Sequence, residues 1–144
     1  MEYKNSKKLY SKAKSLVPGG VSSSIRQTEW PVPLFFEKAH GSKMWDVDGN
    51  IFIDYVMGMG PNIFGHAPEF VTQSVYEDMQ NGYCLTGQTE KENEISEFIQ
   101  KTIPFKRKVR YASSGTEIVQ VALRLARSYT NKNKFLKFEG HYHG

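Results

Sequence analysis

The stretch that decides the fold is KVRYASSGTEIVQVALRLARSYTNKNKFLKF, residues 108–138. Its first part, 108–113, alternates apolar and polar side chains, which is typical of a β-strand. Apolar residues then recur with helical spacing from Ile118 to Tyr129, and FLKF at 135–138 indicates a second short strand. A strand, a helix and a strand joined by tight connections predict a βαβ unit with two parallel strands and a right-handed crossover.

Two loops follow the predicted strands, SSGTE at 113–117 and EGHYHG at 139–144. In an open parallel sheet, ligands bind beyond the carboxyl ends of the strands. We therefore expect the two loops to lie at one edge of the sheet and to form a binding site there.

The first loop has the features of a phosphate site at the start of a helix. Free backbone N–H groups and the helix dipole favour an anion there. Gly115 permits close approach of the backbone, and Ser114 and Thr116 add hydroxyl donors. The alternative is that Ser113 or Ser114 is only a helix N-cap, with Glu117 in the first turn. The local sequence leaves both interpretations open.

The second loop places Tyr142 between His141 and His143. An aromatic ring beside a phosphate site suggests stacking on a planar cofactor or base. A metal site formed by the two histidines is disfavoured, because no clustered carboxylate or cysteine completes a ligand shell. A purely structural loop remains the alternative.

The N-terminal part of the chain predicts one helix and one hairpin. Residues 3–17 predict an amphipathic helix that ends at the PGG of 18–20, with an apolar face of Leu9, Ala13, Leu16 and Val17. The segment 21–34 has no period and is predicted to be irregular. Residues 42–56 predict a β-hairpin around the turn signal Asp48-Gly49-Asn50.

Two further helices are predicted between the hairpin and the βαβ unit. One covers 69–82 and ends at Gly82, and the other covers about 90–102 after a capping box of Thr89 and Glu92. A glycine-punctuated loop precedes them. We therefore expect an N-terminal segment over 1–62 and the start of a larger α/β domain over 63–144.

Composition excludes several classes of protein. The 144 residues are 39% hydrophobic, enough for one modest core, and the single Cys84 fits a reducing compartment. The net charge of +4 comes from basic clusters, but no nucleic-acid motif accompanies them, so a nucleic-acid partner is disfavoured. No apolar run is long enough to span a membrane. A cytoplasmic protein is expected.

Seven segments in order resemble the N-terminal third of class III pyridoxal-phosphate-dependent aminotransferases, and most of all the glutamate-1-semialdehyde aminomutase subgroup. They are LVPGGVSSSIR, GSKMWDVDGNIFIDYV, GPNIFGHAP, TEKENEIS, SSGTE, LRLARSYT and KFEGHYHG. The resemblance runs from about residue 9 to 144. It implies fold type I, an α/β fold with a mainly parallel sheet and flanking helices, and a homodimer acting on small amino and keto substrates.

The resemblance also implies roles for individual residues. Ser114, Gly115 and Thr116 would hold the phosphate of pyridoxal phosphate, and Tyr142 would stack on its ring. Ser23 and Arg26 match the family residues that bind the substrate carboxylate, a role that suits the arginine fork. The catalytic lysine of the family lies beyond residue 144, and no lysine of this chain matches it.

Departures from the subgroup concern mainly the substrate side. Met59 stands where the aminomutases have a tryptophan that shapes the substrate pocket, and Ser113 replaces an asparagine. The family's GHAHP is here GHAP. We therefore expect an aminotransferase acting on another amino or keto substrate, with an aminomutase as the alternative. A catalytically inactive fragment that binds a phosphorylated ligand or a partner subunit is the alternative from another class.

Overall fold

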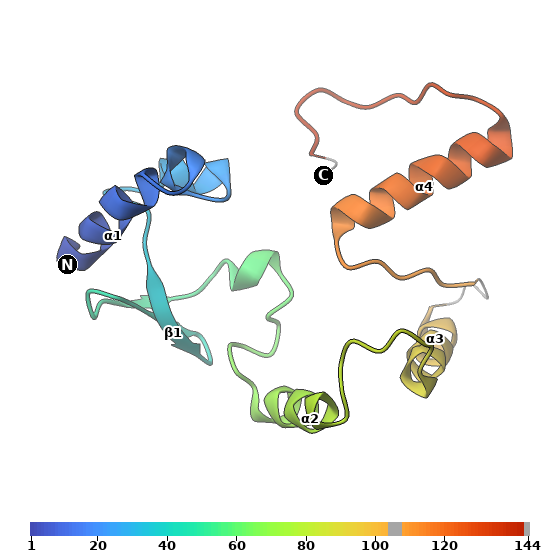
Figure 1. Cartoon of the computed structure of the whole chain (residues 1–144), viewed down its shortest axis with the longest axis horizontal. Helices are drawn as coiled ribbons and strands as arrows, with labels where there is room; N and C mark the ends of the chain where they lie inside the picture. Colours follow the sequence, from blue (N-terminus) through green and yellow to red (C-terminus); the bar gives the residue numbers. More distant parts are fainter. Residues whose placement is uncertain (104–107, 143–144) are drawn as a thin grey trace. The chain divides into compact units, whose positions relative to one another are not determined.

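The computed structural model describes residues 1–103 and 108–142 (Figure 1). The chain divides into two compact units, residues 1–84 and 85–144. The predicted division into an N-terminal segment over 1–62 and the start of a larger domain over 63–144 stays a prediction. Within the described ranges, no helix has both the length and the apolar character needed to cross a membrane.

The first unit contains a three-stranded antiparallel sheet in the order β1-β2-β3. The predicted hairpin is confirmed as β2 (Lys43–Asp46) and β3 (Ile51–Ile53), and Gly49 in the turn has a φ of 81°. Strand β1 (Phe36–His40) was not predicted, because its sequence FEKAH lacks apolar alternation. The remaining elements are α1 (Lys4–Lys14), η1 (Pro18–Gly20), η2 (Ser24–Thr28), η3 (Met57–Met59) and α2 (Glu69–Gln80).

Helix α1 is capped by a residue from the hairpin turn. No side chain next to its start caps it, and the carboxylate of Asp48 instead accepts the backbone N–H groups of Asn5 at 2.6 Å and Ser6 at 2.9 Å. The hydroxyl of Ser6, which is fully buried, donates to the same carboxylate at 2.6 Å. Burial alone would raise the pKa of Asp48, but these hydrogen bonds outweigh it and lower the pKa below its ordinary value.

The predicted apolar face of α1 is only partly correct. Within residues 3–17, the buried and half-buried positions are Tyr3, Ser6, Tyr10, Ala13 and Val17, whereas Leu16 is 69% exposed. The helix is turned this way because its first turn is fixed by polar contacts to the hairpin. Hydrophobic periodicity does not report such contacts.

The second unit contains α3 (Glu90–Thr102) and α4 (Gly115–Thr130), as predicted. The capping box before α3 is wrong in detail. Thr89 is the N-cap, but its side chain makes no capping hydrogen bond, and its carbonyl oxygen accepts the N–H of Glu92 at 3.2 Å.

The two predicted strands of the βαβ unit do not form a parallel pair. Residues 108–113 and 135–138 have no strand partner among the described residues, and β1, β2 and β3 form the sheet that is observed there. Backbone hydrogen bonds to a neighbouring strand define a β-strand, and alternation of side chains does not supply them. Phe135, Leu136 and Phe138 are 55–83% exposed, so the apolar character that suggested a buried strand is uncovered.

The chain turns back at the end of α4. Asn131 adopts the left-handed conformation with a φ of 55° and ends the helix. Arg127 donates from Nε to the carbonyl oxygen of Asn133 at 3.0 Å, and its guanidinium lies 5.5 Å from the centre of the Phe135 ring. These contacts hold the start of the following segment against the last turns of α4.

Candidate functional site at the start of helix α4

Two reciprocal hydrogen bonds close the start of α4. Ser114 is the N-cap, and its hydroxyl oxygen accepts the backbone N–H of Glu117 at 3.2 Å. The Glu117 carboxylate accepts the N–H of Ser113 at 2.9 Å. Ser114 is therefore an N-cap, and its additional role toward an anion stays a prediction. The Glu117 carboxylate thus has a hydrogen-bond donor in the backbone just before the helix.

The cap leaves donors available for an anion. Gly115 and Thr116 occupy the first two helical positions, whose N–H groups have no partner within an α-helix. No acceptor for them is observed in the described part of the chain. The Ser114 hydroxyl accepts one hydrogen bond and keeps its own proton for donation. A Cβ placed on Gly115 would have no atom within 4 Å, so the space beside it is open. These residues fit a phosphate group.

Tyr142 lies at the end of the described chain and is 89% exposed. The turn before it is formed by Gly140, with a φ of 77°, and by the N–H of His141, which donates to the Phe138 carbonyl oxygen at 3.4 Å. The ring of Tyr142 is thus free to contact a ligand. No contact between Tyr142 and residues 113–117 is observed in the described ranges, so its stacking role stays a prediction.

No metal site is observed among the described residues of this region. His143 lies outside the described residues, and within them no group of three or more His, Cys, Asp or Glu side chains could hold a metal ion. The ring of His141 lies 5.5 Å from that of Phe138.

The predicted substrate residues belong to the first unit. Ser23 is the N-cap of η2, and its carbonyl oxygen accepts the N–H of Arg26 at 3.0 Å, so one short turn carries both. Both are exposed, and Arg26 takes part in none of the ion pairs observed among the described residues. Met59 ends η3 with a φ of 68° and is 76% exposed. Their roles toward a substrate stay predictions.

A pair of residues that the sequence analysis did not single out holds the loop that carries Met59. Asp54, only 6% exposed, accepts the N–H groups of Val56 at 2.8 Å and Met57 at 3.0 Å, and contacts His66 Nε2 at 2.7 Å. The hydrogen bond from Met57 and the contact with His66 lower the pKa of Asp54. The available signal was an aspartate at the end of a strand with a histidine at the end of the following glycine-rich loop.

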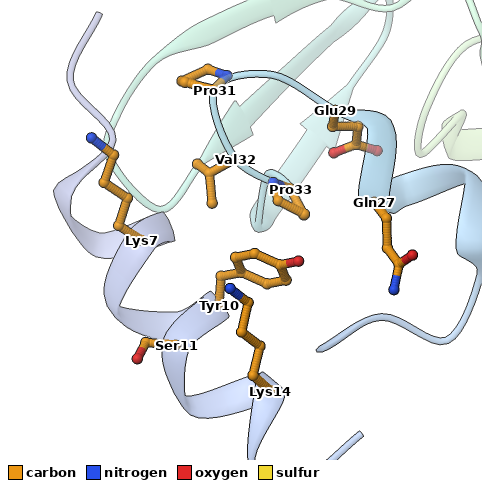
Figure 2. A pocket seen from close by; sticks show the side chains of 9 residues that line it. All are labelled: Lys7, Tyr10, Ser11, Lys14, Gln27, Glu29, Pro31, Val32 and Pro33. Carbon is orange, nitrogen blue, oxygen red and sulfur yellow. The ribbon is translucent and has the colours of Figure 1, made fainter. Parts of the chain in front are cut away.

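The first unit also has a cleft of about 360 Å³ between α1 and residues 27–33 (Figure 2). Lys14 Nζ lies 4.5 Å from the centre of the Tyr10 ring on one side, and on the other Glu29 accepts the N–H of Leu34 at 2.9 Å. None of the predicted cofactor or substrate residues lines it. This cleft belongs to the packing of α1.

Comparison with known proteins assigns the chain to a family. Residues 24–144 match the model of class-III aminotransferases, and the chain belongs to this family. It is 45% identical to glutamate-1-semialdehyde 2,1-aminomutase 1 of Macrococcus caseolyticus, over 100% of this chain and 34% of the relative.

Solved structures agree. A β-phenylalanine aminotransferase from Variovorax paradoxus superposes with a TM-score of 0.90 at 30% identity, over 98% of this chain and 33% of that protein. A transaminase with pyridoxal phosphate bound gives a TM-score of 0.91 at 32% identity, over 100% of this chain and 34% of that protein. The predicted α/β fold of type I is therefore confirmed. The chain spans about a third of the length of the relatives that it matches.

Proposed function

We propose that this chain forms the N-terminal part of a pyridoxal-phosphate-dependent aminotransferase. The observation that carries the proposal is the start of α4, where the N–H groups of Gly115 and Thr116 stay available beside the Ser114 hydroxyl in a member of the aminotransferase family. The solved transaminase with pyridoxal phosphate bound, which shares this fold at 32% identity, supports the choice of cofactor.

In this proposal the residues of the chain bind and orient. Gly115 and Thr116 donate their backbone N–H groups to phosphate oxygens, and the positive end of the α4 dipole stabilises the charge. The exposed ring of Tyr142 covers one face of the cofactor. Pyridoxal phosphate, when bound, acts as an electron sink for the substrate carbon that carries the amino group.

The guanidinium of Arg26 holds the carboxylate of the amino substrate by two parallel hydrogen bonds, with Ser23 beside it on the same turn. The lysine that handles the proton in the family matches no lysine in this chain. Catalysis in this proposal uses a polypeptide of about the relatives' length. We further propose that it works in the cytoplasm as a homodimer.

We favour transfer of the amino group between an amino acid or amine and a keto or aldehyde acceptor, because Met59 takes the place of a pocket-shaping tryptophan. The second candidate is isomerisation of glutamate-1-semialdehyde, and the 45% identity to the Macrococcus caseolyticus aminomutase supports it. The two differ in whether a second, external keto compound is consumed.

The test uses the purified holoenzyme that carries residues 1–144. Its absorption spectrum after reconstitution reports bound cofactor, and two assays then separate the reactions. One follows glutamate-1-semialdehyde without any acceptor, and the other follows a panel of amino donors with a keto acceptor. We expect bound cofactor, acceptor-dependent transfer and no isomerisation.

Isomerisation without an acceptor would replace the aminotransferase by the aminomutase. A purified protein that takes up no cofactor would refute both activities and favour the inactive fragment. Variants of Arg26 refine the first outcome: Arg26→Lys should raise the KM of carboxylate-bearing donors and leave that of simple amines unchanged.

A further inference from the structure

The segment between Asp54 and His66 is a loop whose two ends are fixed to the sheet. At its start, the N–H of Asp54 donates to the carbonyl oxygen of Ser42 at 2.8 Å. At its end, His66 and Gly41 exchange two backbone hydrogen bonds of 2.8 and 2.9 Å. The Asp54 carboxylate joins both ends through its 2.7 Å contact with the His66 ring.

The end of the loop approaches the backbone of Gly41 closely, which disfavours a larger residue at position 65. A Cβ on Gly65 would lie 3.0 Å from the carbonyl oxygen of Gly41, and Gly65 has a φ of 81°. Gly65 therefore permits the loop backbone to lie close to Gly41, and the neighbouring His66 fixes it there by hydrogen bonds.

The backbone inside the loop is strained. Four consecutive residues, Met57, Gly58, Met59 and Gly60, have φ values of 53°, 63°, 68° and 109°. The left-handed region is unfavourable for a residue with a Cβ, and two of the four are methionines. Such a conformation persists only where surrounding contacts enforce it.

The Asp54 carboxylate supplies the enforcing contacts at the start of this run. One of its oxygens accepts the N–H groups of Val56 and Met57, and the other contacts His66. Inside the loop, the Met57 carbonyl oxygen accepts the N–H groups of Gly60 at 3.0 Å and Asn62 at 3.2 Å. The buried Asp54 carboxylate thus holds the strained backbone of this loop, and Met59 within the loop is 76% exposed.

We infer that Asp54 and His66 form a positioning pair that fixes the left-handed backbone of residues 57–60 and the exposed Met59 side chain, and so sets the affinity for the amino substrate. The inference rests on the proposed function, since it assigns Met59 to the substrate. The pair itself touches neither substrate nor cofactor in this assignment. It acts through the backbone of residues 56–60.

The test compares three variants of the holoenzyme. Asp54→Ala removes both sets of contacts, whereas Asp54→Asn keeps an oxygen that accepts the N–H groups of Val56 and Met57. The control is Asp48→Ala, which removes the other backbone-capping carboxylate of the same unit and leaves this loop untouched. Hydrogen exchange of residues 55–65, cofactor content, KM and kcat are measured for each.

For Asp54→Ala we expect faster exchange in 55–65 and unchanged exchange in 43–53. KM for the amino substrate should rise about tenfold to a hundredfold, as for a small displacement of a positioning group, with kcat and cofactor content nearly unchanged. Asp54→Asn should restore most of both properties. Asp48→Ala should change neither.

The outcomes separate the inference from the proposed function. Unchanged exchange, unchanged KM, or equal effects of Asp54→Ala and Asp48→Ala would overturn the inference while an active enzyme upholds the function. Loss of structure throughout the unit in Asp54→Ala, without rescue by Asp54→Asn, would also overturn it. A protein with neither cofactor nor activity would refute the proposed function and the inference that rests on it.

Discussion

Replacing Ser114 by aspartate separates the two roles assigned to the start of α4. Asp is as good an N-cap as Ser, so the carboxylate would take over the N–H of Glu117, which the Ser114 hydroxyl accepts at 3.2 Å. The same carboxylate would place a negative charge where a phosphate is expected. Ser114→Asp should therefore keep the start of the helix capped but weaken phosphate binding. Ser114→Ala should instead weaken the cap.

The sizes of the two effects differ enough to be measured. Loss of an N-cap side chain costs about 1 kcal/mol of helix stability, and this is the expectation for Ser114→Ala. Two like unit charges 4 Å apart repel by about 1 kcal/mol in water and about 4 kcal/mol near a protein surface. For Ser114→Asp we therefore expect phosphate affinity to fall by about fivefold to a thousandfold.

Two assays on the holoenzyme decide the matter. Hydrogen exchange of the Glu117 amide reports the cap, and titration of the cofactor-free enzyme with pyridoxal phosphate reports the anion site. Pyridoxal without its phosphate is the control ligand, since its binding should not change. Ser114→Asp with unchanged affinity for pyridoxal phosphate would show that Ser114 is only a cap and refute the cradle.

Three further predictions concern the first unit. Ser6→Ala removes the hydrogen bond of a fully buried hydroxyl and should lower the free energy of unfolding by about 1 kcal/mol. Ser11→Ala, at an exposed position of the same helix, is the control, and equal losses in the two variants would contradict the prediction. Met59→Gly relieves the strain of a left-handed φ and should raise the free energy of unfolding by about 1 kcal/mol. A lower free energy of unfolding in this variant would argue against backbone strain at Met59. Because the pKa of Asp54 is lowered on folding from 3.8, its stabilisation is complete above the unfolded value and is lost as the pH falls through the folded value. Acid titration of Asp54→Asn should show a smaller loss of stability over that range, and an identical loss would refute the assignment.

The helices and the hairpin followed from the sequence because their signals are local. Apolar spacing marked α2, α3 and α4, and Asp48-Gly49-Asn50 marked the turn between β2 and β3. The N-cap at Ser114 is equally local, since its partner Glu117 lies three residues away. For such features, backbone geometry over one turn is decided by the residues within it.

The parallel pairing of residues 108–113 with 135–138 was predicted from the same kind of pattern and is not observed among the described residues. Alternation shows that a segment has an apolar face. It does not show which strand supplies the hydrogen bonds, because that partner is chosen by the rest of the fold.

The sequence by itself determined the family, the order of the helices and the residues proposed to hold the cofactor, since motifs and periodicity are properties of short segments. The tertiary structure alone decided that Asp48 caps a helix more than forty residues away and that Asp54 closes the loop of Met59 on His66. Asp48 is half-buried and Asp54 is buried, and each contacts residues that lie elsewhere in the sequence. The partners of such a carboxylate depend on which distant segments the tertiary fold brings close to it. Neither the spacing of residues nor the composition of the chain specifies those segments.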